Sequence, residues 1–486
     1  MNVFQGLEPK DVWHYFGEIC QVPRPSKREE RIIAYLVDFG KKYQLTTKTD
    51  EAGNVLIVKP ATKGYENRRT VVLQSHMDMV CEKNGDTHHD FFKDPINPKV
   101  EGEWVKAEGT TLGADDGIGM ASQLAILASK DIEHPELECL FTVDEETGLT
   151  GAFALEKGFL KGRTLINLDS EDEGEIFIGC AGGIDTLATL SYNIRPVPTK
   201  SVAFKIQVKG LRGGHSGDDI HKGYGNANKI LNRFIWEASR AYNVRVYKMD
   251  GGNLRNAIPR EAFAIVTVKK KYVEDFEKDF SNYCKMVFRE LKGVETKLTF
   301  DLNKVEMPRY VMKMRDQWSL LDALYACPNG VIAMSHELPG LVETSTNLAS
   351  IKFHEGNLIE IVTSQRSSID SSKRDIANMV SSVFHLAEAQ VQHSDGYPGW
   401  KPNKNSEILK IAEDSYHKLF GHKPVVRAIH AGLECGLFLE KYPEMDMISI
   451  GPTLRNVHSP DEKINIATVG KFWDHLLDVL KNIPKN

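Results

Sequence analysis

The stretch TVVLQSHMDM, residues 70–79, joins a strand-like run to two side chains suited to chemistry. Its first part, residues 70–75, is a short apolar and β-branched segment typical of a buried strand. His76 and Asp78 follow directly, and residues two apart in an extended segment share a face. We therefore expect Asp78 to reach the imidazole while His76 reaches a metal ion. The competing interpretation is an ordinary hydrogen-bonded histidine at a strand end.

Three further segments repeat this pattern of an apolar run followed by acidic side chains. They are TTLGADDGIG at 110–119, LECLFTVDEETG at 137–148 and TLINLDSED at 164–172. Charged groups gathered where buried strands end are costly unless a positive charge lies among them. Carboxylates and imidazole are the ligands expected of one or two divalent metals. A metal-dependent hydrolase is therefore the first hypothesis.

The segments between these clusters predict a three-layer α/β fold. Residues 28–43 carry apolar side chains at helical spacing, residues 54–59 form another strand-like run, and a helix-like stretch begins at Ile118. Open α/β sheets place their functional groups at the carboxyl ends of strands. The acidic clusters fall at those ends.

Near residue 186 the chain changes character and predicts a separate α+β domain. Strands at 201–208, 261–268, 345–353 and 358–364 alternate there with helices near 223–240, 273–291 and 370–391. A stretch rich in glycine, proline and charge, residues 393–406, resembles a linker. We expect a catalytic domain of residues 1–186 and 399–486, interrupted by an inserted α+β domain of residues 187–398.

Composition excludes several classes of protein. The chain has 486 residues, a net charge of -6 and no long basic run, so nucleic acid is not an expected partner. It has no apolar run of the length of a membrane span and no secretory signal at its start, which favours the cytoplasm. Seven scattered cysteines without a CxxC pair argue against disulfides and a thiolate zinc site. A small molecule is the expected partner.

The adjacent carboxylates leave two interpretations open. Asp115 and Asp116 lie between glycines before a helix, where one can bridge two cations and the other can cap the helix. Glu145 and Glu146 diverge from each other, so one can bind metal while the other accepts a proton, or both can form a solvated turn. Asp169 ends its strand in the same way.

Two histidines compete for the last place in such a site. His458 lies in GPTLRNVHSPDE, residues 451–462, and His430 lies in AIHAGLECG, residues 428–436. Each follows a short strand, and sequence spacing does not choose between them.

The motifs together resemble metallopeptidase family M20 over essentially the whole chain. HMD, GADDGIG, DEETG and NVHSPDE carry this resemblance, together with the strand-ending Asp169. LRGGHSG at 211–217, NLRNAIPR at 253–260, TSQRSS at 363–368 and HAGLECG at 430–436 look closest to the bacterial aminoacyl-histidine dipeptidases of that family. The resemblance implies a zinc-peptidase catalytic domain with an inserted lid, and hydrolysis of unblocked dipeptides. It leaves open whether a C-terminal histidine is favoured.

The resemblance also implies two divalent metal ions, zinc by preference, although cobalt and manganese suit the same ligands. Its implied ligands come from separate segments: His76, Asp115, Glu146, Asp169 and His458. Asp115 would bridge the ions, with His76 and Asp169 on one side and Glu146 and His458 on the other. His430 is left out on family grounds alone.

Catalytic roles follow from the same resemblance. Glu145 would be the general base for a metal-activated water, and Asp78 would orient His76. His215 would donate to the negative oxygen of the tetrahedral intermediate, although its glycine-rich setting also fits an ordinary tight turn.

Two residues of the insert are expected to bind the substrate. Arg366 would pair with the free C-terminal carboxylate, since its planar fork binds a carboxylate in two places, and Asn256 would add a hydrogen bond. These positions imply that the insert closes as a lid. Relatives in the family also make a homodimer possible.

Two alternatives remain open at this stage. One is an M20-type amidohydrolase acting on N-acyl amino acids or tripeptides. The other is a non-catalytic protein that keeps the fold to bind small peptides, which the complete set of ligand and base residue types disfavours.

Overall fold

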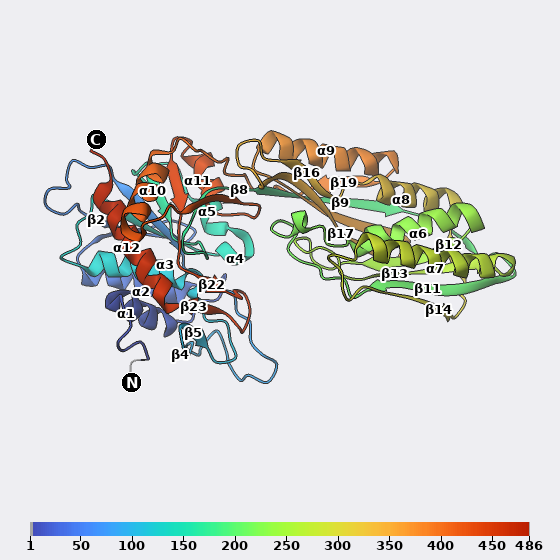
Figure 1. The fold of residues 1–486 in the computed structure, drawn as a ribbon, viewed down its shortest axis with the longest axis horizontal. Coiled ribbons are helices and arrows are strands. Elements are labelled where there is room, and N and C mark those ends of the chain that lie inside the picture. Colours follow the sequence, from blue (N-terminus) through green and yellow to red (C-terminus); the bar gives the residue numbers. More distant parts are fainter. Residues whose placement is uncertain (1–2, 486) are drawn as a thin grey trace. The chain divides into compact units, whose positions relative to one another are not determined.

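The computed structural model describes residues 3–485, and these form two compact units, each with its own hydrophobic core (Figure 1). Unit 1 contains the chain up to Cys180, then Trp400–Ala428, and the chain from Leu433 onward. Unit 2 contains Ala181–Gly399 and the short segment Ile429–Gly432. The association of that short segment with unit 2 is not visible from the order of elements along the chain.

An eight-stranded mixed sheet forms the centre of unit 1. Its order is β1 (Thr46–Thr49), β2 (Val55–Lys59), β6 (Leu137–Thr142), β3 (Val71–His76), β7 (Thr164–Asn167), β21 (Asp446–Ser449), β8 (Glu175–Cys180) and β20 (Val425–Ile429). The four central strands β6, β3, β7 and β21 are parallel. Their carboxyl ends therefore meet at one edge of the sheet. The apolar runs that begin at residues 70, 137 and 164 correspond to β3, β6 and β7, whereas the run at 54–59 corresponds to β2, which is antiparallel to β6.

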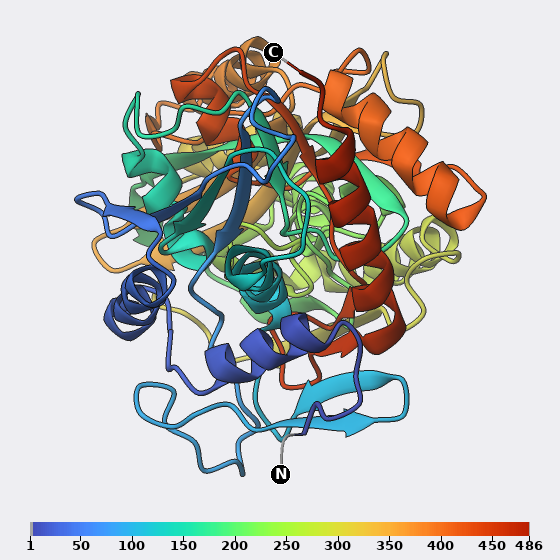
Figure 2. The ribbon, with the colours of Figure 1, turned by 90° about the vertical axis from the view of Figure 1, so that its left-hand side faces the viewer.

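Helices cover both faces of this sheet, which confirms the three-layer α/β prediction (Figure 2). Val71 and Leu73 join one core with residues of α1 (Lys10–Cys20), α2 (Glu30–Lys42), α3 (Ala114–Ala128), α10 (Glu407–Phe420) and α12 (Ile466–Asn482). Val72 lies between them and is buried outside that core, because successive strand residues point to opposite faces. On that other face, α11 (Cys435–Lys441) contacts β8.

Unit 2 is an antiparallel sheet with helices on one face, as the predicted α+β insert requires (Figure 1). The strand order is β14 (Thr299–Val305), β11 (Ser201–Lys209), β13 (Ala262–Lys269), β12 (Arg245–Gly251), β17 (Val342–His354), β18 (Leu358–Ser367), β9 (Gly182–Ser191) and β19 (Gln390–His393), and β16 (Gly330–Met334) pairs with β17. The helices are α6 (Ala227–Tyr242), α7 (Val273–Glu290), α8 (Met314–Ala326) and α9 (Asp370–Leu386). Alternate residues such as Phe204, Ile206 and Val208 enter the core beneath them.

Two local expectations differ from the structure. The helix expected to reach residue 391 ends at Leu386, because the chain turns at Glu388 with a φ of 63° and enters β19. The stretch 393–406, expected to be a linker, contains the buried Trp400, whose backbone pairs with Cys180. Within residues 3–485, the structure contains no helix long and apolar enough to cross a membrane.

Candidate metal centre

Five segments of unit 1 bring the predicted ligands together. His76 is the last residue of β3, Asp169 lies two residues beyond β7, and Glu146 lies in α4 (Glu145–Gly148) just after β6. These strands are neighbours, so their carboxyl ends bring the three side chains close together. Asp115 lies in the first turn of α3. His458 lies in the loop between β22 (Leu454–Arg455) and β23 (Lys463–Asn465).

Asp115 stands between two groups of side chains and turns one carboxylate oxygen toward each. Its Oδ1 lies 3.0 Å from Nε2 of His76, which is also 3.5 Å from Oδ1 of Asp169. Its Oδ2 lies 3.1 Å from Nε2 of His458, which is also 3.0 Å from Oε2 of Glu146. In each group the potential ligand atoms lie within 4.8 Å of one another. The arrangement is that of two sites sharing one carboxylate.

The neighbouring Asp116 has a different role. Its Oδ1 accepts a hydrogen bond from the backbone N–H of Gly119, so this carboxylate caps the start of the helix. Asp115 is thereby left as the aspartate that faces both histidines. The two interpretations of the Asp115 and Asp116 pair therefore apply to one residue each.

The electrostatics of the site favour a cation. Burial raises the pKa of Asp169 to about 7, although His76 opposes the shift. Burial acts to lower the pKa of His458, but its hydrogen bonds to Asp115 and Glu146 outweigh this and raise the pKa to about 11. The raised pKa of Asp169 shows that its negative charge is poorly compensated, and the raised pKa of His458 shows that its neighbours favour a positive charge. A bound cation would supply that charge.

The donor set fits a pair of divalent metal ions. It supplies carboxylate oxygen and imidazole nitrogen, the ligand types that zinc, manganese and cobalt accept. Oε1 of Glu146 is buried and has no hydrogen-bond partner among residues 3–485. A buried carboxylate oxygen without a protein partner is costly, and a cation would remove that cost.

Asp78 connects two of the ligand segments. It is fully buried, and its Oδ1 lies 3.3 Å from Nδ1 of His76. The same carboxylate accepts the backbone N–H groups of Glu145 at 3.0 Å and Glu146 at 3.3 Å, and the hydroxyl of Ser26 at 2.8 Å. Asp78 therefore orients the His76 ring through one contact and holds the turn after β6 through its hydrogen bonds to the two backbone N–H groups.

Glu145 stands beside the ligands, in a group with His76 and Glu146. Burial raises the pKa of its carboxyl well above the usual range, and the negative charges of Asp169 and Glu146 add to the shift. A carboxyl group with a raised pKa is suited to holding and releasing a proton near neutral pH.

The sequence interpretation missed Glu434, which lies near this centre. Its side chain is fully buried, and Oε2 accepts hydrogen bonds from Nε2 of Gln74 at 2.6 Å and the hydroxyl of Thr142 at 2.7 Å. Burial raises its pKa to about 8. Its only signal in the sequence is its place in the string HAGLECG, four residues after His430.

The structure assigns His430 to unit 2 rather than to the metal ligands. Its Nε2 lies 2.8 Å from the hydroxyl of Ser345, and it is absent from every potential metal group found within residues 3–485. Burial lowers its pKa to about 3, and the nearby charge of Arg366 adds to the shift. Of the two histidines that spacing left open, only His458 lies in a potential metal-binding group within residues 3–485, and its role as a ligand stays a prediction.

The three predicted substrate-binding residues lie in unit 2, two of them in direct contact. Arg366 is almost completely buried, with Nη2 at 3.4 Å from Nε2 of His215 and Nη1 donating to the hydroxyl of Tyr397 at 3.1 Å. Asn256 is exposed, and its backbone carbonyl accepts a hydrogen bond from Ser216, next to His215. Nε of Arg366 is buried and has no hydrogen-bond partner among residues 3–485.

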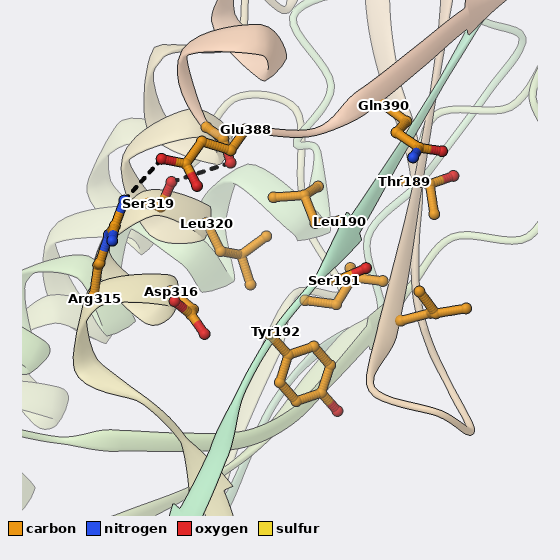
Figure 3. A pocket seen from close by; sticks show the side chains of 13 residues that line it. Thr189, Leu190, Ser191, Tyr192, Arg315, Asp316, Ser319, Leu320, Glu388 and Gln390 are labelled. Carbon is orange, nitrogen blue, oxygen red and sulfur yellow. Dashed lines mark hydrogen bonds and ion pairs between the residues drawn. The ribbon is translucent and has the colours of Figure 1, made fainter.

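A separate cavity of about 500 Å³ opens elsewhere in unit 2, between α8, β9, the start of β18 and the turn that joins α9 to β19 (Figure 3). Arg315 at its rim pairs with Glu388 at 2.8 Å, and Ser319 donates to the carbonyl of Ala387. Its arginine is already engaged, and none of the predicted site residues lines it.

The chain is similar to known proteins over most or all of its length. The model of Peptidase family M20/M25/M40 matches residues 72–482. The chain is 46% identical over 484 residues to the cytosol non-specific dipeptidase of Escherichia coli (strain K12), covering 100% of both chains.

Solved structures of other proteins are also similar to this chain. The chain is similar to the crystal structure of aminoacylhistidine dipeptidase from Vibrio alginolyticus, with 48% identity, a TM-score of 0.91 and 100% of both chains covered. It also shares its fold with a tripeptidase from Staphylococcus aureus, at 17% identity and a TM-score of 0.57, covering 98% of this chain and 99% of that one.

Proposed function

The chain belongs to Peptidase family M20/M25/M40 and is a peptide-bond hydrolase, and we propose that it is a metallo-dipeptidase that cleaves unblocked dipeptides with two divalent metal ions in unit 1. The observation that carries this proposal is the pair of ligand groups sharing Asp115, one on each of its carboxylate oxygens. The names of the two similar dipeptidases support the substrate class.

The proposed ligands are those that surround Asp115. His76 and Asp169 would hold one ion, Glu146 and His458 would hold the other, and Asp115 would bridge them. Two divalent cations in such a site supply an activated water and polarise the substrate carbonyl. Zinc is the proposed metal, and cobalt or manganese would suit the same oxygen and nitrogen donors.

Glu145 is the proposed proton carrier. Its carboxylate would accept a proton from the attacking water and return it to the amine that leaves. Asp78 would keep His76 oriented and would hold the backbone of Glu145 through the 3.0 Å hydrogen bond. The two carboxylates suit different roles because their pKa values are shifted in opposite directions. Burial raises the pKa of Glu145, whereas hydrogen bonds outweigh burial and lower the pKa of Asp78.

Unit 2 would supply the groups that recognise the ends of a dipeptide. Arg366 would pair with the free C-terminal carboxylate, Asn256 would add a neutral hydrogen bond, and His215 would donate to the negative oxygen of the tetrahedral intermediate. A fixed cation at one distance from the scissile bond selects short substrates. The division into residues 1–186, 187–398 and 399–486, with the insert acting as a lid, stays part of this proposal.

A substrate comparison tests the proposal. Zinc-loaded protein should hydrolyse alanyl-histidine faster than an N-acetyl amino acid or a tripeptide, and activity should disappear after exhaustive chelation and return with metal. Preference for the N-acetyl amino acid or the tripeptide would favour the alternative M20-type amidohydrolase. A cytoplasmic location, which the name of the Escherichia coli relative supports, and a homodimer are further predictions for cell fractionation and sedimentation.

A further inference from the structure

Glu462 is a buried residue whose carboxylate accepts hydrogen bonds from the loop that contains Asp115. Its side chain is 2% exposed, and it accepts hydrogen bonds from four successive backbone N–H groups. Oε2 accepts from Leu112 at 2.7 Å and Gly113 at 3.0 Å, while Oε1 accepts from Ala114 at 2.8 Å and Asp115 at 3.4 Å. These amides include the unpaired donors at the start of α3, where a negative charge is favourable.

The same residue belongs to the loop that carries His458. Both lie between β22 and β23, and the backbone N–H of Glu462 donates to the carbonyl of Ser459 at 3.0 Å. His458 itself has a φ of 59°, a conformation that residues other than glycine adopt only when their surroundings hold them there. One carboxylate therefore ties together the two segments that meet at Oδ2 of Asp115.

A second buried charge holds the carbonyl side of the same loop. Arg24 is 3% exposed and donates to the carbonyl of Gly113, and also to the carbonyls of Met77 at 3.0 Å and Asp78 at 2.6 Å. The loop before Asp115 thus has its amides fixed by Glu462 and a carbonyl fixed by Arg24.

We propose that Glu462 is a positioning residue that raises the metal affinity of the centre. It does so by holding the loop of Asp115 and the loop of His458 in a fixed position relative to each other. This inference rests on the proposed two-metal function. A bridging carboxylate must present both oxygens at once, so a small rotation of its backbone weakens both contacts. Partners that orient metal ligands in this way typically contribute about 10- to 100-fold in affinity.

The test replaces one carboxylate oxygen by a donor. In Glu462→Gln the amide NH₂ faces backbone N–H groups that need an acceptor, so the loop must move. We expect at least one zinc ion to bind about 10- to 100-fold more weakly in competition with a chromophoric chelator. We also expect the visible spectrum of the cobalt-substituted protein to change.

Glu138→Gln is the matched control. Glu138 is also 2% exposed in unit 1 and accepts backbone N–H groups, from Lys161 at 2.9 Å and Gly162 at 2.9 Å, but it lies at the opposite end of β6 from Glu145. It should lower the unfolding temperature of the metal-free protein while leaving metal affinity and the cobalt spectrum unchanged. A purely structural role for Glu462 would give that same result.

Glu462→Asp keeps the charge but is one methylene too short to reach all four amides, so it should restore part of the affinity lost in Glu462→Gln. If Glu462→Gln does not fold, the aspartate variant is compared with wild type by the same two measurements. Wild-type zinc affinity and an unchanged cobalt spectrum in the folded variant would overturn the inference while leaving the dipeptidase proposal standing. Failure of the wild-type protein to bind two ions would instead remove the proposed function.

Discussion

Two histidines, His458 of unit 1 and His430 of unit 2, have pKa values that are shifted in opposite directions. In unit 1, the side chain of His458 is 49% exposed, and its hydrogen bonds to Asp115 and Glu146 raise its pKa to about 11. In unit 2, burial lowers the pKa of His430 to about 3, and the positive charge of Arg366 adds to the effect. The pKa of His458 thus reflects the carboxylates beside it, whereas the pKa of His430 reflects burial first and the charge of Arg366 second.

This difference shows what each unit is built to attract. The carboxylates of unit 1 are suited to cations, and the cluster around Arg366 is suited to an anion. The proposed substrate, a dipeptide with a free C-terminus, carries a carbonyl that cations would polarise and a carboxylate that an arginine would pair with.

The largest effect is expected from Asp115→Ala, which removes the carboxylate shared by both ligand groups. Bound metal, measured by mass spectrometry of the purified protein, should fall steeply, and dipeptide hydrolysis should fall to background. Asp172→Asn is the control, because the half-buried Asp172 pairs with Arg455 and belongs to no potential metal-binding group within residues 3–485. Full metal content in Asp115→Ala would contradict the assignment of unit 1 as the cation-binding unit.

Glu145→Gln should separate proton transfer from metal binding. Turnover of alanyl-histidine should fall about 10²- to 10⁴-fold, the usual contribution of a general base, while metal content stays at the wild-type level. Single-turnover kinetics give the chemical step directly. Wild-type turnover in this variant would remove Glu145 from the mechanism, and loss of metal would make it a ligand instead.

Arg366→Ala tests the anion-binding side of the contrast. Loss of a charged hydrogen bond of about 1.5–3 kcal/mol should lower kcat/KM for alanyl-histidine by about 10- to 100-fold. A dipeptide with an amidated C-terminus is the control substrate, since it lacks the charge that Arg366 would pair with. An equal loss for both substrates would show that Arg366 does not recognise the carboxylate.

The smallest effect concerns the stability of unit 2 at low pH. Because the pKa of His430 is about 3 in the folded protein and about 6.5 when unfolded, protonation favours the unfolded state as pH falls below 6.5. Between pH 7 and pH 5.5 this residue should cost about 1 kcal/mol of unfolding free energy. Urea unfolding of wild type and His430→Gln should show a weaker pH dependence in the variant, and parallel curves would contradict the buried neutral histidine.

The sequence predicted the α/β architecture well at short apolar runs that are followed by charged side chains. The runs at 70–75 and 137–143 became β3 and β6, because a buried parallel strand must be apolar on both faces. Proximity of His76 and Asp169 also followed, since the ends of neighbouring parallel strands converge, whereas Asp115 reaches the same place from the first turn of α3. Their roles stay predictions.

Other features depend on packing that no local pattern records. Glu462 looked like part of a polar loop, and only the fold shows four amides around it. His430 and His458 each follow a short strand in the sequence. Only the structure shows that Asp115 and Glu146 lie beside His458 while the charge of Arg366 acts on His430. Residues 429–432 join unit 2 although the chain on both sides belongs to unit 1, which spacing cannot indicate.

Anomalous diffraction at the zinc absorption edge, from crystals of the zinc-loaded protein, tests the central claim most directly. The account predicts two peaks about 3.5–4 Å apart on either side of the Asp115 carboxylate, one beside His76 and one beside His458. A single peak that leaves one oxygen of Asp115 without metal, or peaks located away from this residue, would contradict it.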